Sequence, residues 1–180
     1  MAIKKNIIID GKEVLFKASA AVPRLYRLKF RRDIYKDLKD LKTNVNPEDK
    51  ENSDLDIESL EMFENVAYIM AQHADPANVP NNPDEWLEQF NVFSIYEILP
   101  ELLKLWGMNT EQQVKSKKKA RPLDREMTTP LFLLRCKQLG FHLDELELLT
   151  IGMINDMFIE RENDDYKYAY KATQEDFNNF

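Results

Sequence analysis

Few residues in this chain belong to the types that bind metal ions or act as nucleophiles. Its 180 residues include two histidines, His73 and His142, and a single cysteine, Cys136. Neither histidine stands in a recognisable metal-ligand motif, and one cysteine cannot form a disulfide within the chain. The sequence therefore predicts no metal site and is consistent with a reducing compartment.

The remaining candidates for chemistry have structural explanations. Cys136 shares a predicted apolar helix face with Phe132 and Leu139, which favours a small core residue over a nucleophile. The carboxylate pairs Asp54/Asp56 and Asp164/Asp165 stand in no catalytic motif, and their positions favour a helix cap and a solvated tail. With only 4 glycines, the chain also has no phosphate-binding loop or nucleophile elbow. We therefore expect no catalytic residue and no cofactor, and a protein that is not an enzyme.

The bulk composition is that of a water-soluble globular protein. Hydrophobic residues make up 43% of the chain, and the net charge of -7 disfavours nonspecific nucleic-acid binding by the whole molecule. The N-terminal apolar run, Ile7 to Ile9, ends at Asp10 and is too short for a signal peptide. No apolar run approaches the length of a membrane span, so we expect a cytoplasmic protein without a membrane contact.

The elements predicted from the pattern are mainly helical. Asn6 to Phe16 carries the β-branched run Ile7 to Ile9 before Asp10-Gly11, a two-residue turn signal, and resumes a strand pattern at Val14 and Phe16, which predicts a β-hairpin. Apolar residues at helical spacing then predict helices over 24–42, 55–72, a short segment from Pro83, 94–107 with a kink or restart at Pro100, 131–139, a helical turn over 144–149, and 151–161. The predicted fold class is mainly α with a small N-terminal β-hairpin.

The helix predicted over 24–42 has a strongly basic face. Its cationic side chains are Arg24, Arg27, Lys29, Arg31, Arg32, Lys36 and Lys39. Such a face suits a nucleic acid or an anionic surface, but it also suits a solvated face that attracts the acidic remainder of the chain. The negative overall charge favours the second interpretation.

A basic, almost wholly polar segment divides the chain. Residues 113–125 carry Lys115, Lys117, Lys118, Lys119, Arg121 and Arg125 against Asp124. A segment of this composition buries too little apolar surface to offset the entropy of ordering it. We therefore predict a helical domain over 1–112, a flexible linker over 113–127, and a small helical extension with a polar and aromatic tail over 128–180. A plain surface loop is the alternative to the linker.

The first block resembles a known family. The hairpin Ile-Ile-Ile-Asp-Gly-Lys-Glu-Val-Leu-Phe-Lys-Ala-Ser and the helix Pro-Arg-Leu-Tyr-Arg-Leu-Lys-Phe-Arg-Arg-Asp-Ile-Tyr-Lys-Asp-Leu are similar to those of tail assembly chaperones of long-tailed phages of Gram-positive bacteria. The resemblance covers roughly residues 1 to 110, and the block 141–180 looks like the downstream extension of the same system. It rests on pattern and residue order, since neither block contains a chemical motif.

The resemblance implies a function in tail morphogenesis. The chaperone domain would coat the tape measure protein, and the extension, made by ribosomal frameshifting, would recruit major tail tube subunits. Lys117-Lys118-Lys119 is a candidate frameshift position because adenine-rich lysine codons are slippery. The implied location is the host cytoplasm, with no place in the mature virion, and self-association stays open.

Aromatic and apolar residues at the ends of the predicted helices and in the tail are the candidate partner contacts. They are Trp86, Phe90, Leu102 and Trp106 for the tape measure protein, and Tyr166, Tyr168, Tyr170, Phe177 and Phe180 for the tube subunit. The alternative function is a small nucleic-acid-binding or regulatory protein that uses the basic helix 24–42 and the basic linker.

Overall fold

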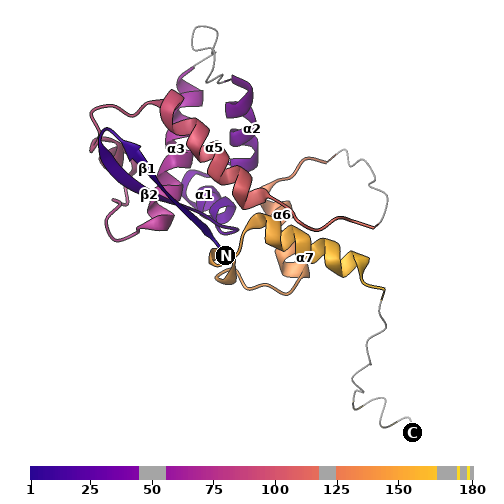
Figure 1. Cartoon of the computed structure of the whole chain (residues 1–180). Coiled ribbons are helices and arrows are strands. Elements are labelled where there is room, and N and C mark those ends of the chain that lie inside the picture. The colour runs from indigo at the N-terminus through magenta and orange to yellow at the C-terminus, as the bar shows by residue number, and fades with distance from the viewer. Residues whose placement is uncertain (45–55, 118–124, 166–173, 175–177, 179–180) are drawn as a thin grey trace.

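The computed structural model describes residues 1–44, 56–117, 125–165, 174 and 178. It is mainly α-helical with a two-stranded antiparallel sheet at the N-terminus, which confirms the predicted fold class (Figure 1). In chain order the elements are β1 (Ile3–Ile9), β2 (Lys12–Ala18), α1 (Val22–Phe30), α2 (Ile34–Asn44), α3 (Ile57–Ala74), α4 (Pro83–Leu87), α5 (Ile95–Thr110), α6 (Thr129–Gln138), the 3₁₀ helix η2 (Glu145–Glu147) and α7 (Ile151–Asn163).

The hairpin forms because a tight turn joins two strands whose side chains are alternately buried and exposed. Asp10 and Gly11 have φ values of 49° and 73°, as a two-residue turn between twisted strands requires. Ile7 and Ile9 are buried, whereas Ile8 between them is 74% exposed. The buried face lies against α3 and α5, so the hairpin is supported by the helices as an isolated hairpin would need to be.

The single helix predicted over 24–42 is wrong, because the chain turns between α1 and α2. Arg31 ends α1 in the left-handed conformation with a φ of 61°, and its N–H donates to the carbonyl of Arg27 at 3.0 Å. The Asp33 carboxylate accepts from the N–H of Tyr35 at 3.2 Å and so begins α2. The same carboxylate accepts from the N–H of Thr129 at 2.9 Å, which attaches the start of α6 to this turn.

Capping residues begin α3 and α4, and a buried face determines the length of α5. Asp56 caps α3 by accepting from Ser59 N–H at 2.7 Å, and Asn82 caps α4 by accepting from Asp84 N–H at 3.1 Å. The prediction that α5 stops at Gly107 is wrong, since the helix runs through Pro100 and Gly107 to Thr110. Its buried face supports this length, because it includes Leu99, Leu102, Leu105, Trp106 and Asn109.

The C-terminal helices pack on the first part of the chain. Thr150 caps α7 by accepting from Met153 N–H at 3.1 Å, and the helix begins at Ile151, where the sequence predicted its start. The backbone N–H groups of Ala2 and Ala20 donate to the carbonyls of Leu148 and Leu149 at 2.9 and 2.8 Å. Figure 1 shows the N-terminus beside the start of α7. Buried residues of α6 and α7 belong to the same hydrophobic core as those of the hairpin and α1 to α5.

Residues 113–117, where the linker was predicted to begin, lie along α7. The Asp156 carboxylate accepts from the N–H groups of Gln113 and Val114 at 3.0 and 3.1 Å. Asn163 accepts from Lys117 N–H at 2.8 Å and donates to the Lys115 carbonyl at 3.0 Å. This stretch is therefore anchored to the extension. Residues 118–124 of the predicted linker lie outside the described residues, and the domain boundaries stay a prediction.

Candidate functional site

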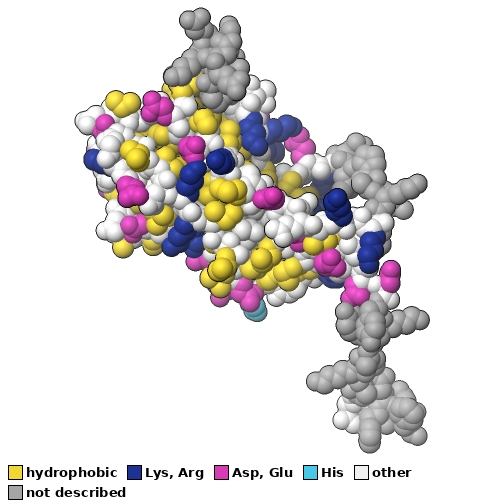
Figure 2. Space-filling model, in the orientation of Figure 1, with side chains coloured by type: hydrophobic (Ala, Val, Ile, Leu, Met, Phe, Trp, Pro, Cys, Tyr) yellow, Lys and Arg dark blue, Asp and Glu magenta, His cyan; other side chains and the backbone are white. Residues whose placement is uncertain are grey.

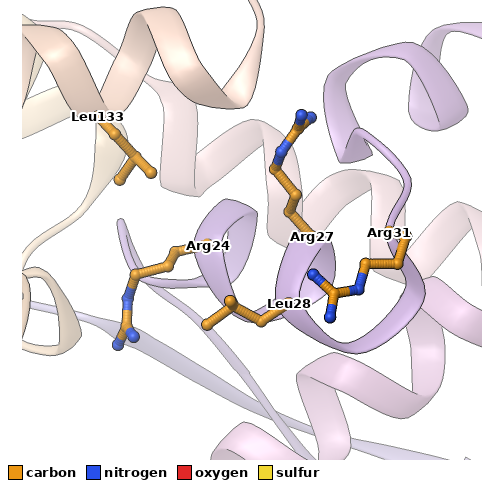
Figure 3. Close-up of a pocket in the computed structure, with 5 residues that line it drawn as sticks. All are labelled: Arg24, Arg27, Leu28, Arg31 and Leu133. Atoms are coloured by element: carbon orange, nitrogen blue, oxygen red, sulfur yellow. The ribbon is translucent and has the colours of Figure 1, made fainter.

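A basic groove beside α1 is the clearest candidate for a binding site. It is lined by Arg24, Arg27, Leu28 and Arg31 from α1 and the turn that follows it, and by Leu133 from α6, and it encloses about 230 Å³. We call it the arginine–leucine groove. Figure 3 shows Leu28 and Leu133 extending into the space beside α1, with the Arg31 guanidinium directed back toward Leu28. The groove therefore offers an apolar centre between positive charges.

Helix geometry places three groove residues on one face of α1. Arg24, Arg27 and Leu28 stand at spacings of i, i+3 and i+4, which share one side of a helix, and Arg31 joins them from the left-handed turn that ends α1. The opposite side of α1 carries Val22, Pro23 and Tyr26 into the core. Because the core holds this opposite face, the groove face of α1 is turned outward. Leu28 is 58% exposed, so it presents apolar surface on this outward face of α1.

The charges of the groove are only partly neutralised within the chain. Arg27 lies 3.4 Å from the Asp33 carboxylate, and Arg24 lies 3.9 Å from the Glu147 carboxylate at the limit of an ion pair. Arg31 makes no ion pair with any acid in the described part of the chain. In addition, the Arg24 Nε–H is buried and has no hydrogen-bond acceptor among the described residues. The groove therefore retains capacity for an anionic partner.

Arg31 adopts a backbone conformation that favours glycine or asparagine. An L-residue with a φ of 61° is strained relative to glycine by about 1 kcal/mol. This conformation ends α1 and returns the arginine side chain toward the groove, as Figure 3 shows. A costly residue at a position that a glycine would fill more easily is a feature often found at functional sites.

The predicted contacts of the first block are mostly core residues. Trp86, Leu102 and Trp106 are 2%, 0% and 6% exposed. Trp86 packs edge-on against Tyr68 and against Phe90, with ring centroids 5.8 and 5.4 Å apart. In the folded chain a partner reaches these three side chains only if the surrounding helices separate, so their packing accounts for their presence.

Phe90 is the half-buried member of the predicted set. It lies beside a shallow hollow between β2, α4 and the end of α3, with the ammonium of Lys12 5.6 Å from the centre of its ring. The predicted tail contacts Tyr166, Tyr168, Tyr170, Phe177 and Phe180 all lie outside the described residues.

A serine and a histidine meet, but the serine is inaccessible. Ser19 Oγ and His73 Nε2 are 2.8 Å apart, and Ser19 Oγ also accepts from Ala21 N–H at 3.1 Å. Ser19 is fully buried, so a substrate has no access to its hydroxyl. Burial, reinforced by the cations of Lys17 and Arg24, lowers the pKa of His73 to about 4. The pair therefore joins β2 and α3 as neutral partners.

The other chemical candidates occupy structural positions. Cys136 is fully buried, as the sequence predicted, and burial raises the pKa of its thiol to about 11. Among the residues that the structure describes, no three histidines, cysteines or carboxylates gather as they would around a metal ion. The described helices also include none with the length and apolar content to cross a membrane.

A second exposed apolar strip lies on α7. Met153 and Met157 are one helical turn apart and are 41% and 43% exposed. Figure 2 shows hydrophobic side chains gathered over this helix. Methionine side chains adapt to irregular partners, so this strip is a second surface on which an apolar partner can lie. Its neighbours on the helix are of both signs, Asp156, Glu160 and Arg161, so it lacks the cluster of arginines that flanks the arginine–leucine groove.

Sequence reasoning found half of the groove. The sequence predicts the basic face of 24–42, but that prediction does not include Leu28 in the middle of the face. The i, i+3, i+4, i+7 spacing was the signal that groups Leu28 with the three arginines. Leu133 carries no comparable signal, because it reaches the groove through a tertiary contact between α1 and α6.

Comparison with known proteins adds no identification. No protein-family model matches the chain, and no significant match is found among curated proteins or solved structures. The arguments for a function therefore come from the chain's own sequence and geometry.

Proposed function

We propose that this chain is a tail assembly chaperone of a long-tailed phage or prophage, a binding protein for the tape measure protein. The resemblance of roughly residues 1 to 110 to that family supports the proposal. The structural observation that carries it is the arginine–leucine groove, an open apolar surface between two helices that is flanked by arginines only partly neutralised within the chain. Grooves of this type hold amphipathic helices in many complexes.

The proposal includes a mode of action. The tape measure protein is long and helical in the related systems, so one molecule offers many sites to many copies of the chain. Several weak contacts along one client give high avidity while each copy remains easy to displace. The segment 128–180, including α6, α7 and the tail, is then the part that recruits tail tube subunits during assembly in the host cytoplasm, and the chaperone is absent from the finished virion.

Co-expression with the tape measure protein encoded in the same genome tests this function. We expect the tape measure protein to be insoluble alone and soluble when the chain is present. Deleting residues 166–180 should leave that activity intact and should abolish capture of the tail tube subunit. A tape measure protein that remains insoluble beside a folded, abundant chain contradicts the proposal.

The alternative is a nucleic-acid-binding protein, and three arginines on one face of α1 favour it. Several other cations of the basic region are already paired, since Arg32 contacts Asp37 at 2.7 Å and Lys39 pairs with Glu126. Binding of DNA or RNA that falls steeply with salt, together with no effect on the tape measure protein, supports this alternative.

A further inference from the structure

We propose that the arginine–leucine groove binds an acidic amphipathic helix of a partner protein. An apolar side chain of that helix fills the space between Leu28 and Leu133, and its carboxylates pair with Arg24, Arg27 and Arg31. The inference rests on the proposed function only in naming the partner, which there is a segment of the tape measure protein. The groove's preference for an acidic helix follows from its own residues.

Charge selects the partner. The chain as a whole has a net charge of -7, yet three arginines surround this one hollow. Arg31 has no ion pair among the described residues, and the contacts of Arg24 and Arg27 with acids are 3.9 and 3.4 Å long. Each guanidinium has five N–H donors, so all three arginines retain donors for carboxylates of a ligand. A basic partner would be repelled at this position.

The spacing of the arginines selects a helix. With a rise of about 1.5 Å per residue, the backbones of Arg24 and of Arg31, the residue that ends α1, are about 10 Å apart along the helix axis. Carboxylates seven residues apart on a partner helix have the same separation, and an apolar residue four after the first lies between them on the same face. This pattern, acidic at i and i+7 and apolar at i+4, mirrors the positions of Arg24, Leu28 and Arg31.

The apolar centre of the groove disfavours two other occupants, a nucleic acid and a second copy of this chain. A phosphate backbone provides anions for the arginines but no aliphatic group for Leu28, which is 58% exposed. A second copy bound symmetrically would bring the same three arginines against their own counterparts. An acidic helix with an aliphatic centre satisfies both the charges and the apolar surface.

A labelled peptide tests the inference without the tape measure protein. The probe is a capped alanine-based helix of about sixteen residues, a length that remains helical in water, with a leucine at the centre and glutamates four before and three after it. Matched control peptides replace the glutamates by lysines or the leucine by serine. Fluorescence anisotropy with the full chain should show the acidic peptide binding at least about tenfold tighter than the lysine peptide, with affinity falling as salt rises.

Paired variants locate the site. Arg27→Glu with Arg31→Glu should weaken binding of the acidic peptide at least about tenfold and improve binding of the lysine peptide, whereas Lys104→Glu on the exposed side of α5 should change neither. Leu28→Ser should weaken binding of the leucine peptide, and Leu134→Ser, at a side chain of similar exposure (53%), should not. Circular dichroism and the midpoint of thermal unfolding confirm that each variant is folded.

The outcomes separate this inference from the proposed function. Equal binding of acidic and lysine peptides, or unchanged binding by the folded double variant, overturns the groove inference. So does displacement of the acidic peptide by a DNA or RNA oligonucleotide that binds more tightly at the same salt. If the peptides behave as expected but the tape measure protein remains insoluble, the groove inference stands and the proposed function fails. If the folded double variant still keeps the tape measure protein soluble, the function stands and the groove is not its client site.

Discussion

Gly152 occupies a place where no larger residue fits, and its replacement gives the sharpest test of how the C-terminal helices pack. A Cβ atom added at Gly152 would lie 1.7 Å from the carbonyl oxygen of Glu111 and 2.7 Å from its carbonyl carbon. The first turn of α7 therefore touches the backbone at the end of α5. At Gly107, which also lies inside a helix, an added Cβ meets nothing within 4 Å. The two glycines form a matched pair.

The expected free energies have opposite signs. Replacing a helical glycine with alanine gains about 0.5–1 kcal/mol from helix propensity, and Gly107→Ala should gain this amount. In Gly152→Ala the Glu111 backbone must move by more than 1 Å. The neighbouring N–H groups of Gln113 and Val114 resist that shift, because they donate to the Asp156 carboxylate. Overpacking costs about 1–3 kcal/mol, and weakening these charge-assisted bonds adds about 1–2 kcal/mol. The net loss in Gly152→Ala should be about 2–4 kcal/mol.

Thermal and urea unfolding measure both variants against the wild type. For a chain of this length we expect Gly152→Ala to lower the unfolding midpoint by roughly 5–10 °C and Gly107→Ala to raise it by about 2 °C. The fluorescence of Trp86 and Trp106, which report on the first block, should shift together with the circular dichroism signal. A Gly152→Ala protein as stable as the wild type would refute the close packing of α7 on α5. A tryptophan transition that stays unchanged while the helical signal loses stability would show that 128–180 unfolds separately.

Three further predictions follow from single side chains. Because the folded-state pKa of His73 is about 4 and the unfolded value is 6.5, its contribution to stability is complete above pH 6.5 and is lost as pH falls toward 4. This contribution is at most about 3 kcal/mol. Urea unfolding measured across that pH range should show that the free energy of unfolding depends less steeply on pH in His73→Gln than in the wild type. Tyr26→Phe removes a buried 2.5 Å hydrogen bond to Asp37 and should lower the free energy of unfolding by about 1–3 kcal/mol. Tyr35→Phe should be neutral or stabilising, because the Tyr35 hydroxyl is buried with no hydrogen-bond partner among the described residues. Denaturant unfolding compares the two variants. Arg31→Gly should raise stability by about 1 kcal/mol while it weakens binding of the acidic peptide, and a variant that loses stability would contradict the strain assigned to this residue.

Local signals predicted much of the fold. The Asp10-Gly11 turn fixes the hairpin, and the caps at Asn82 and Thr150 begin α4 and α7 where the sequence indicated. In each case a few consecutive residues determine the backbone, so no distant contact is needed. The burial of Cys136 was also predictable, because its helix face is apolar in the sequence.

The errors occur where distant residues decide the local structure. The turn between α1 and α2 depends on Asp33, whose carboxylate binds the backbone of Thr129, 96 positions away. α5 continues past Gly107 because its buried face extends to Asn109, which donates to the Ser19 carbonyl at 3.3 Å and accepts from Ile151 N–H at 3.4 Å. Neither interaction has a sequence signature.

In the candidate site, too, the local signal is visible in the sequence and the distant contact is not. The arginines of α1 were visible as a basic face, but the groove requires Leu133 from α6 beside Leu28. The sequence favours its aromatic residues as contacts because tryptophan and phenylalanine are common anchors of interfaces. Trp86 and Trp106 instead fill the core, since a small helical chain uses its largest side chains where they bury most surface.

The most direct test of the account is the complex between this chain and the tape measure protein of the same genome. The two proteins are co-expressed and purified through a tag on the tape measure protein, and the mass of the eluted species is measured by light scattering. We expect one complex in which several copies of the chain are bound to each tape measure molecule, and we expect the complex to be lost with Arg27→Glu and Arg31→Glu together. A folded chain that elutes apart from the tape measure protein would contradict it.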